Sequence, residues 1–100
     1  MVINGVNFPE GAIADFCRRH GVKKLSLFGS ILGDDFRPDS DVDLLVEFEP
    51  GRTPGMIGFG GMILELKAMI GREVDLRTPF DFSPFFRPAV LREARTLHAA

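Results

Sequence analysis

The sequence predicts an α+β fold of the mixed α/β kind, in which a small mixed sheet has its helices packed on one side. Three observations lead to this prediction. Some segments alternate polar and apolar residues, as strands do, whereas others repeat apolar residues every three or four positions, as helices do. The two kinds of segment also take turns along the chain. Because the chain has 100 residues, we expect a single domain, residues 1–100.

The first predicted helix covers residues 9–20. Ile13 and Phe16 recur along it at helical spacing, and Gly21 is the residue type that most often ends a helix. Residues 23–28 then alternate polar and apolar side chains, which indicates a strand with one buried face.

A turn separates this strand from the next one. Ser30 is a good N-cap, so a short helical turn is predicted from there through about Asp34. Residues 37–40, Arg-Pro-Asp-Ser, are typical of a turn. The second strand is predicted over residues 41–48, and its two faces differ in character. One face contains Val42, Leu44 and Val46, and the other contains Asp41, Asp43, Leu45 and Glu47.

The second half of the chain continues the alternation. Residues 56–70 predict a helix with an apolar stripe, and Gly71 ends it. Residues 73–77 predict a short third strand whose apolar side chains face the core. After a proline-containing loop, residues 89–97 have the spacing of a last amphipathic helix.

The composition excludes several functions. A formal net charge of −2 provides no basic field to hold nucleic acid, so direct nucleic-acid binding is not expected. No apolar run approaches the ~20 residues that cross a bilayer, so no membrane partner is expected. The single cysteine, Cys17, has no partner in the chain and is interpreted as a small core residue, which predicts a reducing, cytoplasmic location.

Three aspartates are the candidate catalytic and metal-binding residues. Asp41 and Asp43 are two positions apart on one strand, so their carboxylates lie side by side and repel each other unless a cation lies between them. Asp75 lies between Val74 and Leu76, and it projects onto the same face if the two strands are neighbours. Carboxylate oxygens suit Mg²⁺ or Mn²⁺, and three converging carboxylates are enough for a two-metal site.

Gly29 and Ser30 predict a phosphate-binding turn beside these aspartates. The glycine permits close approach of the backbone, and free N–H groups at the start of the following helical turn bind phosphate readily. The loop from Ser30 to Ser40 is short enough to bring this turn near Asp41.

Together these motifs resemble the signature of the polymerase-beta-type nucleotidyltransferase superfamily. The chain has LFGS at residues 27–30, a nine-residue spacer, SDVDLLVEF at residues 40–48, and VDLRT at residues 74–78 after a helix. The closest resemblance is to the shortest branch of that superfamily, the minimal nucleotidyltransferase domain proteins, and it covers nearly the whole chain. It implies a nucleotidyltransferase-like fold.

The resemblance also implies a role for each motif residue. Gly29 and Ser30 would grip the triphosphate, and Ser40 matches the nucleotide-binding position before the first aspartate. Asp41 and Asp43 would bind both metal ions. Asp75 would bind one metal ion and help to activate an acceptor hydroxyl. The implied reaction transfers a nucleoside monophosphate, AMP from ATP, with Mg²⁺ or Mn²⁺ as cofactor and pyrophosphate as product.

The resemblance implies a protein partner as well. Proteins of this kind are commonly antitoxins that attach AMP to a tyrosine of a HEPN-type toxin. The chain contains no tyrosine of its own, which agrees with an acceptor on another protein. The expected partners are therefore a nucleoside triphosphate and a HEPN-type toxin.

One departure from the family pattern keeps other hypotheses open. Many members have a basic residue at the position of Gly33, where this chain has no charge, although Lys23, Arg37 or Arg77 can compensate. If none does, the chain is a catalytically weak or inactive antitoxin that neutralises its partner by binding alone. A structural metal-binding domain is a third hypothesis.

The proline-containing segment has four phenylalanines, which leave two interpretations open: Phe80, Phe82, Phe85 and Phe86. They form a contact with a partner or with a second copy of the chain in a homo-oligomer, or they hold the loop against the core.

Overall fold

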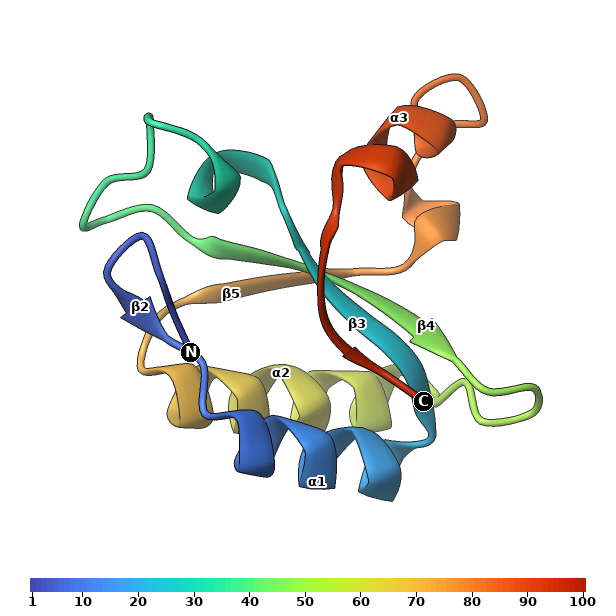
Figure 1. Ribbon diagram of the computed structural model, residues 1–100. Helices are drawn as coiled ribbons and strands as arrows, with labels where there is room; N and C mark the ends of the chain where they lie inside the picture. The colour runs from blue at the N-terminus through green and yellow to red at the C-terminus, as the bar shows by residue number, and fades with distance from the viewer.

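The computed structural model describes all 100 residues, and it confirms the α+β fold with a mixed sheet (Figure 1). Two 3₁₀ turns, Gly29–Leu32 and Pro79–Asp81, interrupt the regular elements. In chain order the strands and helices are β1 Val2–Ile3, β2 Val6–Asn7, α1 Glu10–His20, β3 Val22–Phe28, β4 Val42–Phe48, α2 Met56–Ile70, β5 Val74–Arg77, α3 Arg87–Glu93 and β6 Arg95–Ala99.

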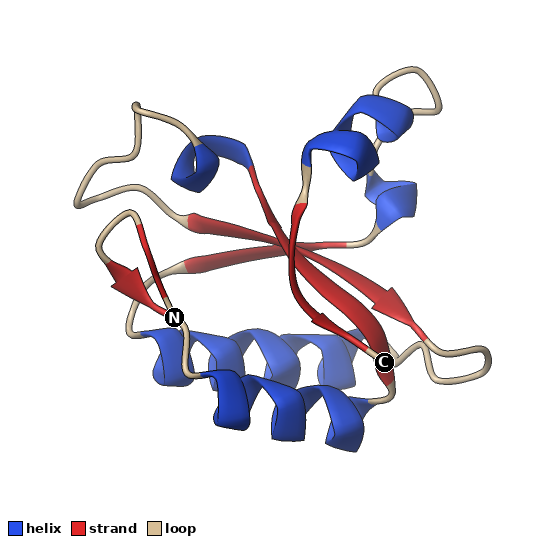
Figure 2. Cartoon of the chain, in the orientation of Figure 1, coloured by secondary structure: helices blue, strands red, loops and turns tan.

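The main sheet has four strands in the order β5-β4-β3-β6. Strand β4 runs parallel to β5, whereas β3 is antiparallel to both of its neighbours, so the sheet is mixed as predicted. Figure 2 shows the strands crossing between α1 and α2 on one side and α3 with the second 3₁₀ turn on the other. Because β3 and β4 are antiparallel, the end of β3 lies next to the start of β4, where Phe28 is opposite Asp43.

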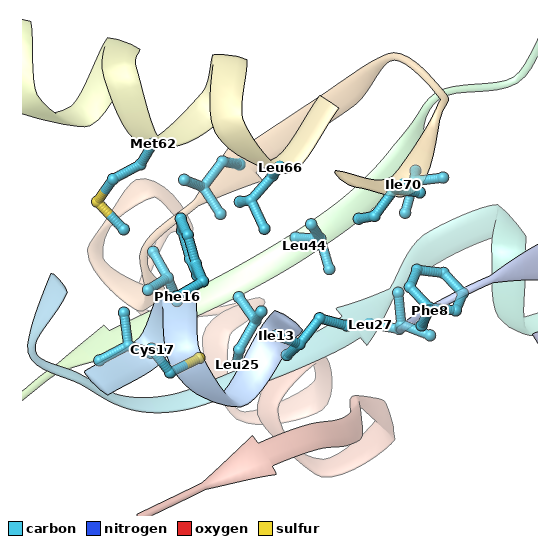
Figure 3. Close-up of a cluster of buried hydrophobic side chains, with 14 of the residues drawn as sticks. Phe8, Ile13, Phe16, Cys17, Leu25, Leu27, Leu44, Met62, Leu66 and Ile70 are labelled. Carbon is cyan, nitrogen blue, oxygen red and sulfur yellow. The ribbon is translucent and has the colours of Figure 1, made fainter. Parts of the chain in front are cut away.

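Helices α1 and α2 pack against one face of the sheet and form the core with it. Apolar side chains from both helices meet those of β3 and β4 (Figure 3). Among the fully buried members are Phe16, Leu27, Leu44 and Leu66. Cys17 also lies in this core, and burial raises the pKa of its thiol to about 11, so it stays a protonated, unreactive core residue as predicted.

Both long helices end where the sequence predicted. Gly21 and Gly71 follow α1 and α2 in the left-handed conformation, with φ of 65° and 76°. Residues with a Cβ adopt this conformation at a cost, which explains why glycine marks the two helix ends. No helix combines the length and the apolar character that a membrane crossing needs.

Two local predictions were wrong. Ser30 does not cap the turn that follows β3, because Phe28 occupies the N-cap position and Ser30 lies inside the 3₁₀ turn, which ends at Leu32 rather than near Asp34. The predicted helix over residues 89–97 is also wrong, since α3 begins and ends earlier and residues Arg95–Ala99 form β6. Strand β6 pairs with the edge of β3, whose backbone N–H and C=O groups would otherwise lack partners, and this pairing outweighs helical propensity.

A small N-terminal hairpin was not predicted, although the sequence contains its signal. Strands β1 and β2 are joined by Asn4 and Gly5, which have φ of 51° and 81°. Asn-Gly is the preferred pair for a two-residue hairpin turn. The Asn4 side chain donates hydrogen bonds to the carbonyl oxygens of Ile31 (3.2 Å) and Gly33 (3.0 Å), so the hairpin supports the turn that follows β3.

Candidate active site

Two of the three predicted aspartates lie side by side on the face of the sheet opposite α1 and α2. Asp43 in β4 and Asp75 in β5 are direct register partners of a parallel pair. Val42 and Leu44, which flank Asp43, are completely buried on the helix side, and Leu76, which follows Asp75, is buried in the same core, so both aspartates project to the other side. The structure therefore brings carboxylates from two strands together, as the alternation of β4 predicted.

Asp43 is the electrostatic centre of this face. Partial burial raises the pKa of its carboxyl, and the negative charges of Asp75 and Asp41 raise that pKa further. The positive charge of Arg77 and a hydrogen bond from the backbone N–H of Ser30 act in the opposite direction and lower it. The net shift of the pKa is upward, so the ionised form of Asp43 is less favoured here than that of a carboxylate in water.

Asp41 differs from this pair, because it is exposed and precedes the first residue of β4. No three Asp, Glu, His or Cys side chains converge closely enough to hold a metal ion in this arrangement. The face nevertheless fits a hard cation in its chemistry, since its candidate ligands are all carboxylate oxygens and their negative charges outnumber the single guanidinium beside them. Asp43 and Asp75 are the central residues of this candidate cation site, and Asp41 adds its negative charge to it.

Arg77 is the cation that lies against these carboxylates. Its Nε donates to both carboxylate oxygens of Asp75 at 3.3 and 3.2 Å, and its Nη2 donates to Oδ2 at 3.2 Å. The ion pair raises the pKa of Arg77, which stays fully charged. The guanidinium also lies 5.9 Å from the centre of the Phe82 ring, which packs edge-on against Phe28.

Gly29 is required by the close approach of Asp43. It follows β3 with φ of 77°, and a Cβ placed there would overlap Oδ2 of Asp43 and lie 3.1 Å from its Cγ. The structure shows that this glycine makes room for the carboxylate. The close approach of its backbone to a phosphate, which the sequence predicted, stays a prediction. The backbone N–H of the next residue, Ser30, lowers the pKa of the same carboxylate. The Gly29-Ser30 turn and Asp43 therefore form one unit.

Ser40 helps to close the turn that leads into β4. Its hydroxyl accepts a hydrogen bond from the N–H of Arg37 at 2.9 Å, and its own N–H donates to the Arg37 carbonyl at 3.0 Å. This confirms the turn predicted over residues 37–40. Its proximity to nucleotide stays a prediction.

Arg72 is a residue that the sequence reasoning missed. It donates to the carbonyl oxygens of Ser40 (2.7 Å) and Arg37 (3.0 Å), and its guanidinium lies 4.7 Å from the centre of the Phe36 ring. These hydrogen bonds hold the loop before Asp41 against Arg72, which is the second residue after the end of α2. No local sequence pattern predicts this contact, because an arginine after a helix-ending glycine resembles an ordinary solvated residue.

Only one of the three candidate replacements for a basic residue at Gly33 lies beside the aspartates. Lys23 is at the far end of β3, where it lines a hollow of about 470 Å³ together with Glu47 and Arg87. Arg37 is exposed on the turn. Of the three, Arg77 alone lies on the face of the sheet that presents Asp43 and Asp75, called the site face below, and it contacts a carboxylate directly.

The phenylalanines of the proline-containing segment divide into two groups. Three of them, Phe80, Phe85 and Phe86, are exposed, with 83%, 84% and 60% of their surface accessible. Phe82 is half-buried against Phe28 and belongs to the wall of the site face.

Comparisons with known proteins identify the family of the chain. The profile of a family described as "Nucleotidyltransferase domain" matches residues 10–97. A relative from Methanocaldococcus jannaschii, whose name proposes a protein adenylyltransferase, is 36% identical over 89% of this chain and 94% of its own length. The protein adenylyltransferase MntA of Thermococcus cleftensis is 36% identical over 75% of this chain and 74% of its own length.

Solved structures show the same fold. A structure described as a minimal nucleotidyltransferase superposes with a TM-score of 0.70 at 39% identity, covering 85% of each chain. A complex of an AMPylated HEPN toxin from Shewanella oneidensis with its MNT antitoxin superposes with a TM-score of 0.63 at 22% identity, covering 91% of this chain and 70% of the other. At that lower identity, the likeness establishes the fold alone.

Proposed function

The chain belongs to the nucleotidyltransferase domain family, and from that premise we propose that it transfers AMP from ATP to a tyrosine hydroxyl of a HEPN-type toxin and thereby acts as its antitoxin. The observation that most supports this proposal is the register pairing of Asp43 with Asp75 beside the Gly29-Ser30 turn. The chain itself is a nucleotidyltransferase, and the proposal concerns its donor, its acceptor and its site.

The relatives support the choice of donor and acceptor. Two of them are named as protein adenylyltransferases, and a structural neighbour is an antitoxin in complex with an AMPylated HEPN toxin. The absence of tyrosine from this chain agrees with an acceptor supplied by the partner.

The residues on the site face have distinct proposed roles. Gly29 and Ser30 lie where a triphosphate would meet the backbone next to Asp43. Asp75 is half-exposed, so its carboxylate can accept a hydrogen bond from an incoming acceptor hydroxyl and take up its proton. Ser40 orders the turn that ends at Asp41.

Asp41, Asp43 and Asp75 are the residues that would hold Mg²⁺ or Mn²⁺. Such an ion, when bound, neutralises phosphate charge and favours the ionised acceptor oxygen. Asp43 is the strongest candidate ligand, because burial and, after it, the negative charges of Asp75 and Asp41 raise the pKa of its carboxyl, and a bound cation would offset both effects.

A second candidate function is neutralisation of the partner by binding alone. The observation that favours it is the ion pair of Arg77 with Asp75, which engages one of the three aspartates. The lack of a charged side chain at Gly33 points the same way. Under this hypothesis the aspartates are dispensable for protection against the toxin.

A labelling experiment separates the two functions. The chain, the HEPN-type partner, Mg²⁺ or Mn²⁺ and labelled ATP are combined, and the partner is analysed by mass spectrometry for attached AMP. We expect the unchanged chain to label a tyrosine of the partner, the Asp43→Asn variant to leave it unlabelled, and Asp35→Asn, at an exposed loop position, to label normally. An unlabelled partner that is still inhibited would instead establish neutralisation by binding.

A further inference from the structure

We propose that Arg77 is the phosphate-binding cation of this site, which neutralises Asp75 in the empty enzyme and exchanges that carboxylate for triphosphate oxygens when metal and nucleotide bind. The inference rests on the proposed function in one respect, the placement of the nucleotide on this face of the sheet. The structure shows Arg77 bound to Asp75, and the proposal adds a second state in which Arg77 binds the triphosphate.

The contact between Arg77 and Asp75 is suited to exchange. Its three hydrogen bonds are 3.2–3.3 Å long, whereas charge-assisted bonds of full strength are about 2.7–2.9 Å. The two side chains keep 45% and 37% of their surface accessible, so water can replace either partner. An exposed pair of this kind is weak and easily separated.

The position of Arg77 confines its guanidinium to the site face. Arg77 is the register partner of Leu45, which lies two residues beyond Asp43 on the same side of β4. The Phe82 ring stands 5.9 Å from the guanidinium carbon and limits how far the side chain can turn away. A guanidinium released from Asp75 therefore remains beside the carboxylates and close to any phosphate that a cation on Asp43 would hold.

The charge of the site calls for such a cation. Three aspartates and a triphosphate bring together a large negative charge, and the segment after Gly29 has no basic residue until Arg37. Two other cations are committed elsewhere, because Arg72 is bound to loop carbonyl groups and Lys23 lies at the far end of β3. A planar guanidinium that already forms several hydrogen bonds with a carboxylate can do the same with phosphate oxygens.

This exchange predicts opposite effects on two ligands, which a merely structural role would not produce. Without nucleotide, Arg77 competes with metal for Asp75, so its removal should favour metal. With nucleotide, Arg77 contributes hydrogen bonds to the triphosphate, so its removal should weaken binding. A residue that only stiffens the site would weaken both ligands together.

The test compares Arg77→Ala, Arg77→Lys and the unchanged chain by calorimetric titration. The first titration uses Mn²⁺ alone, and the second uses a non-hydrolysable ATP analogue in saturating Mn²⁺. For Arg77→Ala we expect the dissociation constant of Mn²⁺ to fall about two- to fivefold, the scale of one exposed ion pair. We expect the dissociation constant of the analogue to rise about tenfold, the scale of a hydrogen bond to a charged group.

Two controls accompany these variants. Arg77→Lys keeps the charge but loses the fork of donors, so it should bind the analogue with intermediate affinity. Arg92→Ala removes an exposed arginine of α3 without an ion pair and should match the unchanged chain in both titrations. Circular dichroism and thermal unfolding verify that each variant is folded.

The outcomes distinguish this inference from the function on which it rests. Parallel weakening of both ligands by Arg77→Ala, or no change in either, would overturn the role of Arg77 while leaving AMP transfer intact. Failure of the unchanged chain to bind the analogue at all would overturn the nucleotide site itself. Neither readout requires the partner or turnover, so an error about the acceptor does not affect the result.

Discussion

The two faces of β4 show how a single strand serves both stability and chemistry. Toward α1 and α2, the strand presents Val42, Leu44 and Val46, all fully buried in the apolar core. Toward the other side it presents Asp43, a carboxylate whose pKa is raised by burial and by two neighbouring aspartates. One face therefore stabilises the fold, whereas the other face accumulates charge at a cost in stability, as binding sites commonly do.

The difference between the faces is also a difference in what covers them. The helix side is closed by two long helices whose side chains interlock with the strands. The site side is bordered by the half-buried Phe82 and the Pro79–Asp81 turn, and it leaves Asp75 and Arg77 partly accessible. The comparison predicts that substitutions on the two faces have separable effects on stability and on activity.

The largest expected effect is on the site face. Asp43→Asn should lower AMP transfer about a thousandfold or more, roughly 4 kcal/mol of transition-state stabilisation, because the face loses the carboxylate nearest the phosphate-binding turn. The measurement is the rate of partner labelling at saturating ATP.

The same substitution should leave the fold as stable as before or make it more stable. Because the pKa of Asp43 is raised in the folded state, its ionisation destabilises the fold fully above the raised pKa, and not at all below the usual value of 3.8. Asparagine removes that destabilisation at neutral pH. Urea unfolding at pH 7 measures it, and a clear loss of stability in Asp43→Asn would show that this carboxylate holds the fold together.

The neighbouring residue should behave in the opposite way. Leu44→Ala leaves a cavity between β4 and the helices and should reduce the free energy of unfolding by roughly 2–5 kcal/mol. The folded fraction should label the partner at a nearly normal rate, because Asp43 and Asp75 stay in register. A rate loss that exceeds the loss of folded protein would indicate that the two faces are coupled.

Gly29 tests the point where β3 meets the site face. Gly29→Ala should destabilise the fold by about 1–2 kcal/mol through its positive φ, and the added Cβ should also displace the Asp43 carboxylate. Such a displacement should reduce labelling about a hundredfold.

Gly51→Ala is the matched control for this substitution. Gly51 has φ of 76°, nearly the same as Gly29, but a Cβ there has no atom within 4 Å. It should show the conformational cost alone, with labelling unchanged. Equal labelling by the two variants would mean that Asp43 adjusts to the added methyl group and that the close approach is unimportant.

Much of this comparison could be predicted from the sequence because its signals are local. The alternation along β4 assigned each side chain to a face, and Asp75 between two apolar residues assigned the third aspartate to the same face. Glycine at 21 and 71 marked the helix ends. These features depend on residues that are close together in the chain, so a single sequence is enough to predict them.

The remaining features depend on contacts between distant segments. Whether residues 95–99 form a helix or a strand is decided by the free edge of β3, about 70 residues earlier in the chain. The anchoring of the 37–40 turn by Arg72 spans 32 and 35 residues. The reason for Gly29 is likewise a contact with another strand, so the sequence indicated that glycine was needed without showing what it accommodates.

The smallest effect is expected from the ion pairs on the outer surface of the helices. Glu65 of α2 pairs with Arg19 and with His20 of α1, and Arg19 beside it lowers the pKa of Glu65 below the usual 4.5. This contribution to stability is present above pH 4.5 and is lost as the pH falls through the lowered pKa. Glu65→Gln should therefore be slightly less stable than the unchanged chain at pH 7, and the difference should disappear in acid.

Urea unfolding at pH 7 and at pH 3 measures this difference, with Glu93→Gln, which removes a carboxylate without an ion pair, as the control. Partly exposed pairs contribute little, because water solvates the separated charges almost as well. The helix-covered face should accordingly owe its stability to buried apolar side chains such as Leu44 and Leu66. A Glu65→Gln effect as large as that of Leu44→Ala would instead mean that surface charge joins α1 to α2, and the contrast between an apolar face and a charged face would no longer explain the fold.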